Sequence, residues 1–150
     1  MHKYRNIFLS SALTFLGISG LAELAHATKQ PLLIAPFGAS FLILSAMPES
    51  PFARPRNIAL GYLLSAIIGL VLLKSFGDHI WTLGLAVALA IFLMDISNTV
   101  HPPAGAVPLL ILTSHPQWSF LWTPIMVSAV ILVLISLLNR ELFRRKLLYV

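Results

Sequence analysis

The chain contains no cysteine, and only 10% of its residues are charged. The lack of cysteine excludes thiol catalysis, disulfide bonds and cysteine-based metal sites. A soluble globular domain carries about 25% charged residues, so this composition, with 58% hydrophobic residues, excludes an ordinary soluble domain. The net charge of +5 comes from basic residues that form no patch with interleaved aromatics, which argues against nucleic-acid binding. A polytopic membrane protein fits, and 150 residues are too few for two ordinary domains.

Six apolar segments make up most of the chain. A membrane-spanning helix needs roughly 17–25 mainly apolar residues, which the first and last segments provide directly and the third and fourth provide with their flanks. The second and fifth segments are short and contain internal proline and glycine. We predict an all-α polytopic membrane protein of a prokaryotic cytoplasmic membrane, with segments at about Ile7–Leu24, Leu32–Ala46, Ile58–Leu73, Ile80–Met94, Ala104–Thr113 and Phe120–Leu138.

The first segment also has features of a secretory signal peptide. It follows the basic start "MHKYR", and Ala25-His26-Ala27 fits a small-residue cleavage site. Glu23 at the end of the stretch and the apolar segments downstream favour an uncleaved first span instead.

The short segments share a motif. "PFGA" (36–39) opens the second and "PAGA" (103–106) opens the fifth, and each precedes an aliphatic run at the same offset. We therefore predict two three-segment repeats, about 5–77 and 78–140, followed by a basic amphipathic tail over 140–150 that lies on anionic lipid. If all six segments cross, the second repeat is inverted relative to the first, as in many transporters.

The positive-inside rule tests the number of crossings. Six crossings place eight of the ten basic residues on one side and leave Lys29 and Lys74 on the other. If the second and fifth segments turn back instead, the division is seven against three. The rule favours six crossings with both termini cytoplasmic, although turning back stays open. The eight are Lys3, Arg5, Arg54, Arg56, Arg140, Arg144, Arg145 and Lys146.

Two segments carry small residues four positions apart, which let helix backbones approach closely in lipid. The third segment has Gly61, Ser65 and Gly69, and the fourth has Gly84 and Ala88. We interpret both sets as packing faces without a chemical role.

The two proline-glycine breaks are the candidate functional site. Prolines keep the preceding residue extended and suit the first turn of a new helix. A helix that starts at membrane depth has free N–H groups and about half a positive charge, which suits an anion. We predict that the starts at Pro36–Ser40 and Pro103–Val107 meet as an anion-selective constriction. The alternative is that both breaks only kink helices for packing.

Polar residues in "MDISNTVH" precede the second break. Asp95 and His101 could bind a metal, but no third ligand is in reach. We interpret Asn98 and His101 as hydrogen-bonding the broken backbone, and His101 could also titrate near neutral pH and couple a proton to transport. Arg56, close to Arg54, either anchors the cytoplasmic loop or lines the anion's cytoplasmic route.

The chain resembles the HPP family of integral membrane proteins. "APFGAS", "ARPRN" with "GYLLSA", and "MDISNTVHPPAGA" carry the resemblance, which extends over about Leu33 to Thr113, and the eponymous His-Pro-Pro is His101-Pro102-Pro103 here. The resemblance implies four or so membrane spans and a transport role, with nitrite uptake associated with some members in photosynthetic prokaryotes and plastids.

We therefore predict a transporter or channel for a small inorganic anion, nitrite above all, embedded in the lipid bilayer as a homo-oligomer. We expect no metal, no cofactor and no enzymatic activity, because no catalytic arrangement is visible. The alternative function is a non-transporting membrane module that assembles or regulates a partner. The predicted binding residues are Pro36, Gly38, Ala39, Ser40, Arg56, Asn98, Thr99, His101, Pro102, Pro103, Gly105 and Ala106.

Overall fold

The computed structural model describes residues 2–28 and 35–147, which are almost entirely helical and include no strand. The predicted all-α class is thus confirmed. The described helices are α1 (His2–Thr28), α2 (Ala35–Ala46), α3 (Pro55–Phe76), α4 (Ile80–Ile96), α5 (Val107–Ser114) and α6 (Val127–Leu147), with short 3₁₀ helices η1 (Pro51–Ala53) and η2 (Pro102–Ala106) and the π-helical turn η3 (Leu121–Met126).

Three described stretches are long and apolar enough to cross a membrane: Ile7–Ala27, Pro55–Phe76 and Leu121–Glu141. Three apolar helical stretches are shorter. Two of these, Ala35–Ala46 and Pro102–Ser114, are the short segments expected from the sequence. The third is α4, whose 17 residues reach only the lower limit of a spanning helix.

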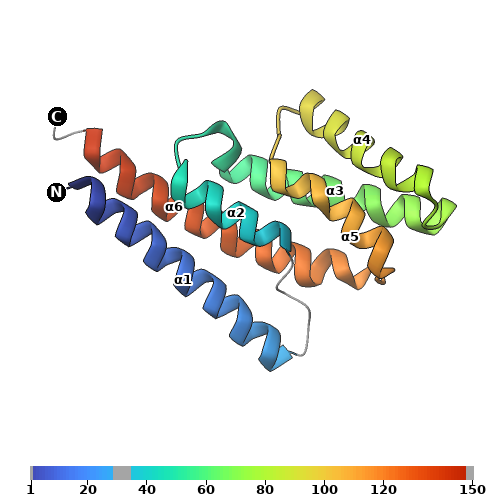
Figure 1. Ribbon diagram of the computed structural model, residues 1–150, viewed down its shortest axis with the longest axis horizontal. Coiled ribbons are helices and arrows are strands. Elements are labelled where there is room, and N and C mark those ends of the chain that lie inside the picture. Colours follow the sequence, from blue (N-terminus) through green and yellow to red (C-terminus); the bar gives the residue numbers. More distant parts are fainter. Residues whose placement is uncertain (1, 29–34, 148–150) are drawn as a thin grey trace.

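Successive helices alternate in direction (Figure 1). The start of α3 meets the end of α4, where the Arg56 guanidinium donates to the Ser97 carbonyl. At the opposite end His115 Nε2 lies 3.0 Å from an Asp78 carboxylate oxygen. Among the described residues, α2 and α5 are each one continuous helix.

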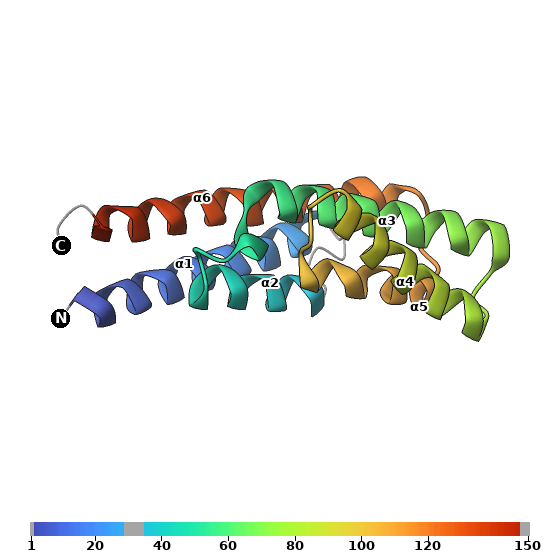
Figure 2. The same ribbon diagram turned by 90° about the horizontal axis from the view of Figure 1, so that it is seen from above.

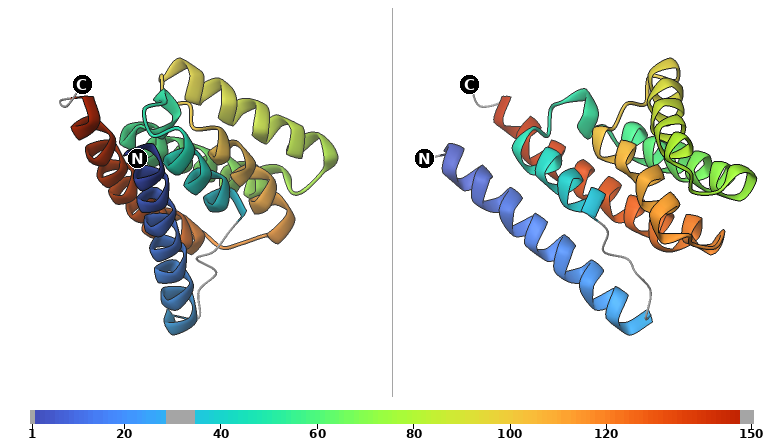
Figure 3. Two further views of the ribbon diagram at one scale, coloured as in Figure 1. Left: turned by 60° about the vertical axis from the view of Figure 1, so that its left-hand side comes forward. Right: turned by 45° about the vertical axis from the view of Figure 1, so that its right-hand side comes forward.

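The helices form two layers, with α3 and α6 along one side and α2 and α5 along the other (Figure 2). α3 packs against α4, α5 and α6, while α6 packs against α1, α2 and α3. α1 and α4 lie on opposite flanks (Figure 3). The core that these layers enclose is apolar, and its largest fully buried side chains are Tyr62, Phe37, Phe41, Leu21, Leu44, Ile58, Leu70, Met94, Ile111, Leu112 and Ile125.

The small residues of α3 allow close packing, as the sequence predicted for that segment. A Cβ on Gly61 would lie 3.0 Å from the His101 Cβ, and one on Gly69 would lie 3.1 Å from the Pro108 Cα. The second predicted packing face behaves differently. A Cβ on Gly84 of α4 meets no heavy atom within 4 Å, so this face has no partner among the described residues.

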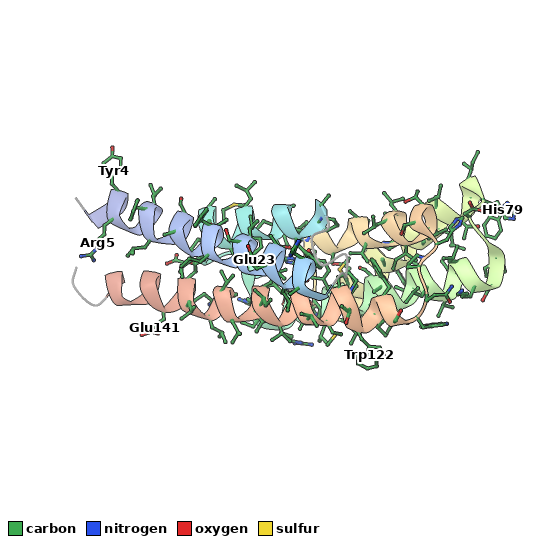
Figure 4. The ribbon with its side chains drawn as sticks, turned by 90° about the horizontal axis from the view of Figure 1, so that it is seen from below. Tyr4, Arg5, Glu23, His79, Trp122 and Glu141 are labelled. Atoms are coloured by element: carbon green, nitrogen blue, oxygen red, sulfur yellow. The ribbon has the colours of Figure 1, made fainter. Side chains whose placement is uncertain are left out.

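The chain termini lie together. Figure 4 shows Arg5 and Glu141 toward one end of the molecule and His79 at the other. The described part of the predicted tail over 140–150 does not form a separate element. Its backbone continues α6 as far as Leu147. The side chains on which its amphipathic character depends lie outside the described residues.

Candidate functional site at the two helix breaks

The second break begins with the turn that ends α4. The Ser97 hydroxyl donates to the Leu93 carbonyl at 2.6 Å and is hydrogen-bonded to the Thr99 hydroxyl at 2.7 Å. Asn98 has a φ of 53°, a left-handed conformation that asparagine tolerates better than most residues. These contacts turn the chain away from α4 and explain why polar residues precede the break.

The prolines then start η2 from an extended residue. His101 has φ −133° and ψ 97°, as expected for a residue that precedes proline. Pro102 and Pro103 have no N–H, the Ala104 N–H donates to the His101 carbonyl at 2.9 Å, and the Val107 N–H donates to the Ala104 carbonyl. The start of η2 therefore offers fewer free donors than the sequence suggested.

A chain of side-chain hydrogen bonds joins the two breaks. His101 Nε2 lies 2.7 Å from Ser40 Oγ, and Ser40 Oγ lies 2.8 Å from the Tyr62 hydroxyl. His101 Nδ1 lies 2.8 Å from the Phe52 carbonyl. A carbonyl only accepts, so Nδ1–H donates to it. A neutral His101 ring then accepts at Nε2 from Ser40, which in turn accepts from Tyr62.

All three side chains of this chain are completely buried. The structure thus brings Ser40 and His101 together, as predicted, but the Ser40 hydroxyl and both His101 ring nitrogens are hydrogen-bonded to other protein groups. The interpretation that His101 hydrogen-bonds the broken backbone agrees with its bond to the Phe52 carbonyl. Thr99 is also completely buried.

The first turn of α3 holds the break from the other side. Asn57 Nδ2 donates to the Val100 carbonyl at 2.9 Å and is 7% exposed. Arg56 remains exposed and donates to the Ser97 carbonyl at 3.1 Å. Asn57 and Tyr62 were not predicted from the sequence to contact the breaks, although an asparagine in the first turn of an apolar helix is a signal for such a contact.

The Gly-Ala pairs of both motifs face outward. Gly38, Ala39 and Ala106 are exposed and Gly105 is half-buried. A Cβ added to Gly38 or to Gly105 meets no heavy atom within 4 Å. The backbone at each break is therefore covered on one side by the core and open on the other.

The remaining predicted residues divide between core and surface. Pro36 and Pro103 are buried, whereas Pro102 and Asn98 are exposed. Asp95 is exposed at the end of α4. Over the described part of the chain no group of three His, Asp or Glu side chains is gathered in a way that could hold a metal ion, so the proposed Asp95–His101 pair has no third ligand there.

Comparison with known proteins shows the family of the chain. A model of the HPP transmembrane region matches residues 1–147. The chain belongs to the HPP transmembrane family. His101-Pro102-Pro103, part of the sequence that carried the resemblance, lies at the start of η2 and therefore at the second break.

Two transmembrane proteins of Dictyostelium discoideum are relatives of this HPP protein. One is 33% identical over 145 residues, covering 89% of this chain and 51% of the relative. The other is 29% identical over 145 residues, covering 89% of this chain and 47% of the relative. The chain thus spans about half the length of the curated relatives it matches. No solved structure matches it.

Proposed function

We propose that this protein carries a small inorganic anion, nitrite being the best candidate, across a membrane along the open side of the two helix breaks. The observation that supports this most is the pair of outward-facing Gly-Ala openings, Gly38-Ala39 and Gly105-Ala106, at the starts of two short helices. The positive end of a helix dipole favours an anion there.

Charge at the openings agrees with an anion. Neither α2 nor the stretch Pro102–Ser114 contains an acidic residue. Gly38 lies in the first turn of α2, at the positive end of the helix dipole. With no side chain of its own and no neighbour over it, Gly38 lets a small ion approach the backbone.

The predicted contacts divide into two roles in this proposal. Arg56, exposed in the first turn of α3, attracts the anion at the cytoplasmic mouth. Ser40, Thr99 and His101 set the geometry of the breaks, because their polar atoms already have protein partners.

We further propose that the fold is an inverted repeat whose halves pair α1 with α4, α2 with α5, and α3 with α6. The helix contacts agree with this pairing. α3 packs on α5 as α6 packs on α2, and α3 packs on α4 as α6 packs on α1. The burial of residues 35–46 also closely matches that of residues 102–113, position by position. Both termini are cytoplasmic in this arrangement, in a prokaryotic cytoplasmic membrane, with the exposed Arg54 and Arg56 on the same side.

The test is nitrite flux into liposomes that contain purified protein. Gly38→Leu places a side chain over the open side of the α2 start, where an added Cβ meets no heavy atom within 4 Å, and we expect at least a tenfold loss of flux at an unchanged unfolding temperature. Gly84→Leu is the control, because Gly84 is equally free of neighbours but lies away from the breaks. Arg56→Gln is expected to reduce flux several-fold, while Arg54→Gln changes it little.

The second candidate function is a membrane module that assembles or regulates a partner. The closed hydrogen bonding of His101 and Ser40 favours it, because these polar residues at membrane depth serve the fold. If wild-type liposomes move neither nitrite, nitrate, formate nor chloride under any pH gradient, the transport proposal is wrong and this candidate replaces it.

A further inference from the structure

All three tryptophans of the chain lie at the end of the molecule opposite the termini. Trp81 is in the first turn of α4, Trp118 is in the turn after α5, and Trp122 is in η3. The contact between Asp78 and His115 brings these turns together, although they are far apart in the sequence. We call the three tryptophans the tryptophan collar. Their exposed fractions lie between 47% and 67%.

The exposed surface changes in a regular order from this end inward. The turns expose polar side chains, among them Asp78, His79 and Gln117. The collar follows, and beyond it every exposed residue is apolar over residues 82–94 of α4 and over residues 123–138 of η3 and α6. A membrane protein meets its surroundings in the same order, from water through the headgroup region, where tryptophan is enriched, to the hydrocarbon core.

The collar residues lie on more than one face of the molecule. α4 and α6 both pack on α3 and lie on opposite sides of it (Figure 1), so Trp81 and Trp122 are on different faces. Figure 4 shows Trp122 projecting away from the helices. A protein partner on one face leaves the tryptophan on the other face uncovered, whereas a lipid leaflet reaches both.

The chemistry of these side chains also fits lipid headgroups. An indole has an apolar ring and an N–H donor, so it suits a region that is apolar on one side and wet on the other. Ile80, next to Trp81, is 90% exposed, and Phe76 packs edge-on against Trp81 with ring centroids 5.5 Å apart. This apolar group lies directly beside the carboxylate of Asp78, as expected at a boundary between lipid and water.

We propose that the tryptophan collar binds the phospholipid headgroup region of the leaflet opposite the termini and fixes the depth of the protein there. This anchoring does not depend on anion transport. The boundary of the hydrocarbon core then lies in the first turn of α4, and the pair of Asp78 and His115 lies in water. The stretch Pro102–Ser114 runs inward from this boundary for about 20 Å, which leaves the second break inside a core about 30 Å thick.

Depth-dependent fluorescence quenching tests the anchoring. Each single-tryptophan protein, with the other two tryptophans changed to phenylalanine, is placed in phosphatidylcholine vesicles whose acyl chains carry bromine either near the headgroup or near the chain end. We expect the shallow bromine to quench each collar residue at least twofold more strongly than the deep bromine.

The control is Phe92→Trp in a protein whose three collar residues are phenylalanine. Phe92 is 58% exposed, similar to Trp81 at 54%, but it lies about 16 Å further along α4. The deep bromine is therefore expected to quench this tryptophan more strongly than the shallow one.

The leaflet is tested with the collar intact, which keeps the anchoring testable where a phenylalanine variant does not fold. Protein labelled with fluorotryptophan gives ¹⁹F signals, and an impermeant gadolinium chelate is added to either side of vesicles that hold the protein in one orientation. We expect the three collar signals to broaden together from one side, and the added signal of Tyr4→Trp to broaden from the other. A collar residue quenched like Phe92→Trp, a collar residue that no lipid bromine quenches, or broadening of the collar and Tyr4→Trp signals from the same side would each overturn the anchoring.

Discussion

At the scale of single residues, His101 connects three parts of the chain. Its imidazole contacts the η1 carbonyl of Phe52 and the α2 hydroxyl of Ser40, while its ring lies 5.4 Å from that of Tyr62 on α3. A buried polar network with every member paired rigidifies a core, whereas a half-paired one is costly. His101 therefore holds the second break to η1 and α2 in this structure.

Ser40→Ala is expected to destabilise the protein more than Tyr62→Phe. The first change leaves His101 Nε2 and the Tyr62 hydroxyl without their partner, at about 1–3 kcal/mol for each buried unpaired group. The second removes one terminal donor, at about 1 kcal/mol. Thermal unfolding in detergent measures both.

Ser65→Ala provides the internal control for this comparison. Ser65 is also completely buried, but its hydroxyl has no hydrogen-bond partner, so its removal is expected to be neutral or slightly stabilising. If Ser40→Ala and Ser65→Ala unfold at the same temperature, the hydrogen-bonded chain contributes nothing to stability.

At the scale of elements, α3 is the helix on which the site depends. It carries Asn57 and Tyr62, which contact the break, and Gly61 and Gly69, which let the break and α5 approach. The close approach needs glycine at both positions because backbone or Cβ atoms lie within 3.1 Å of an added Cβ.

Gly69→Val is therefore expected to push α5 from α3 and to lower stability by about 1–3 kcal/mol, the usual cost of overpacking. Gly84→Val, in open surroundings on α4, is expected to change stability by less than about 0.5 kcal/mol. The unfolding temperatures of the two variants give the comparison. Equal losses would contradict a packing role specific to Gly69.

At the scale of the whole molecule, the ends of the chain meet in a polar seam. The Ser10 hydroxyl donates to the Asn139 side-chain oxygen, 129 residues away, and the Asn139 amide donates to the Leu44 carbonyl at 3.1 Å. Thr14 and Ser45 hydrogen-bond beside them. The seam attaches α1 to α2 and α6 and places both termini at one end.

The alternating arrangement predicts which residues face each side of a membrane. Single cysteines at Glu49 and Asn98 are expected to react with an impermeant maleimide from the side of the termini, and cysteines at Asp78 and Gln117 from the opposite side. Tyr4→Cys marks the terminal side in oriented vesicles. Labelling of Asp78→Cys and Glu49→Cys from the same side would contradict six alternating passes.

The sequence by itself determined the class of the protein and the place of its breaks. Low charge, apolar segments and proline act locally. Lipid demands internal hydrogen bonding, and proline breaks or kinks a helix interior but is tolerated in a first turn. The two Pro-x-Gly-Ala motifs thus located the short segments, and the family's residues located the second break.

Only the tertiary structure decided what the residues at the breaks contact. Ser40 and His101 are 61 residues apart, and no local pattern shows that the Ser40 hydroxyl hydrogen-bonds to the His101 ring. Nor could spacing show that Gly61 is packed while Gly38 is open, because both are glycines in apolar helices. Burial depends on which helix lies opposite, and that is set by the packing of the whole chain.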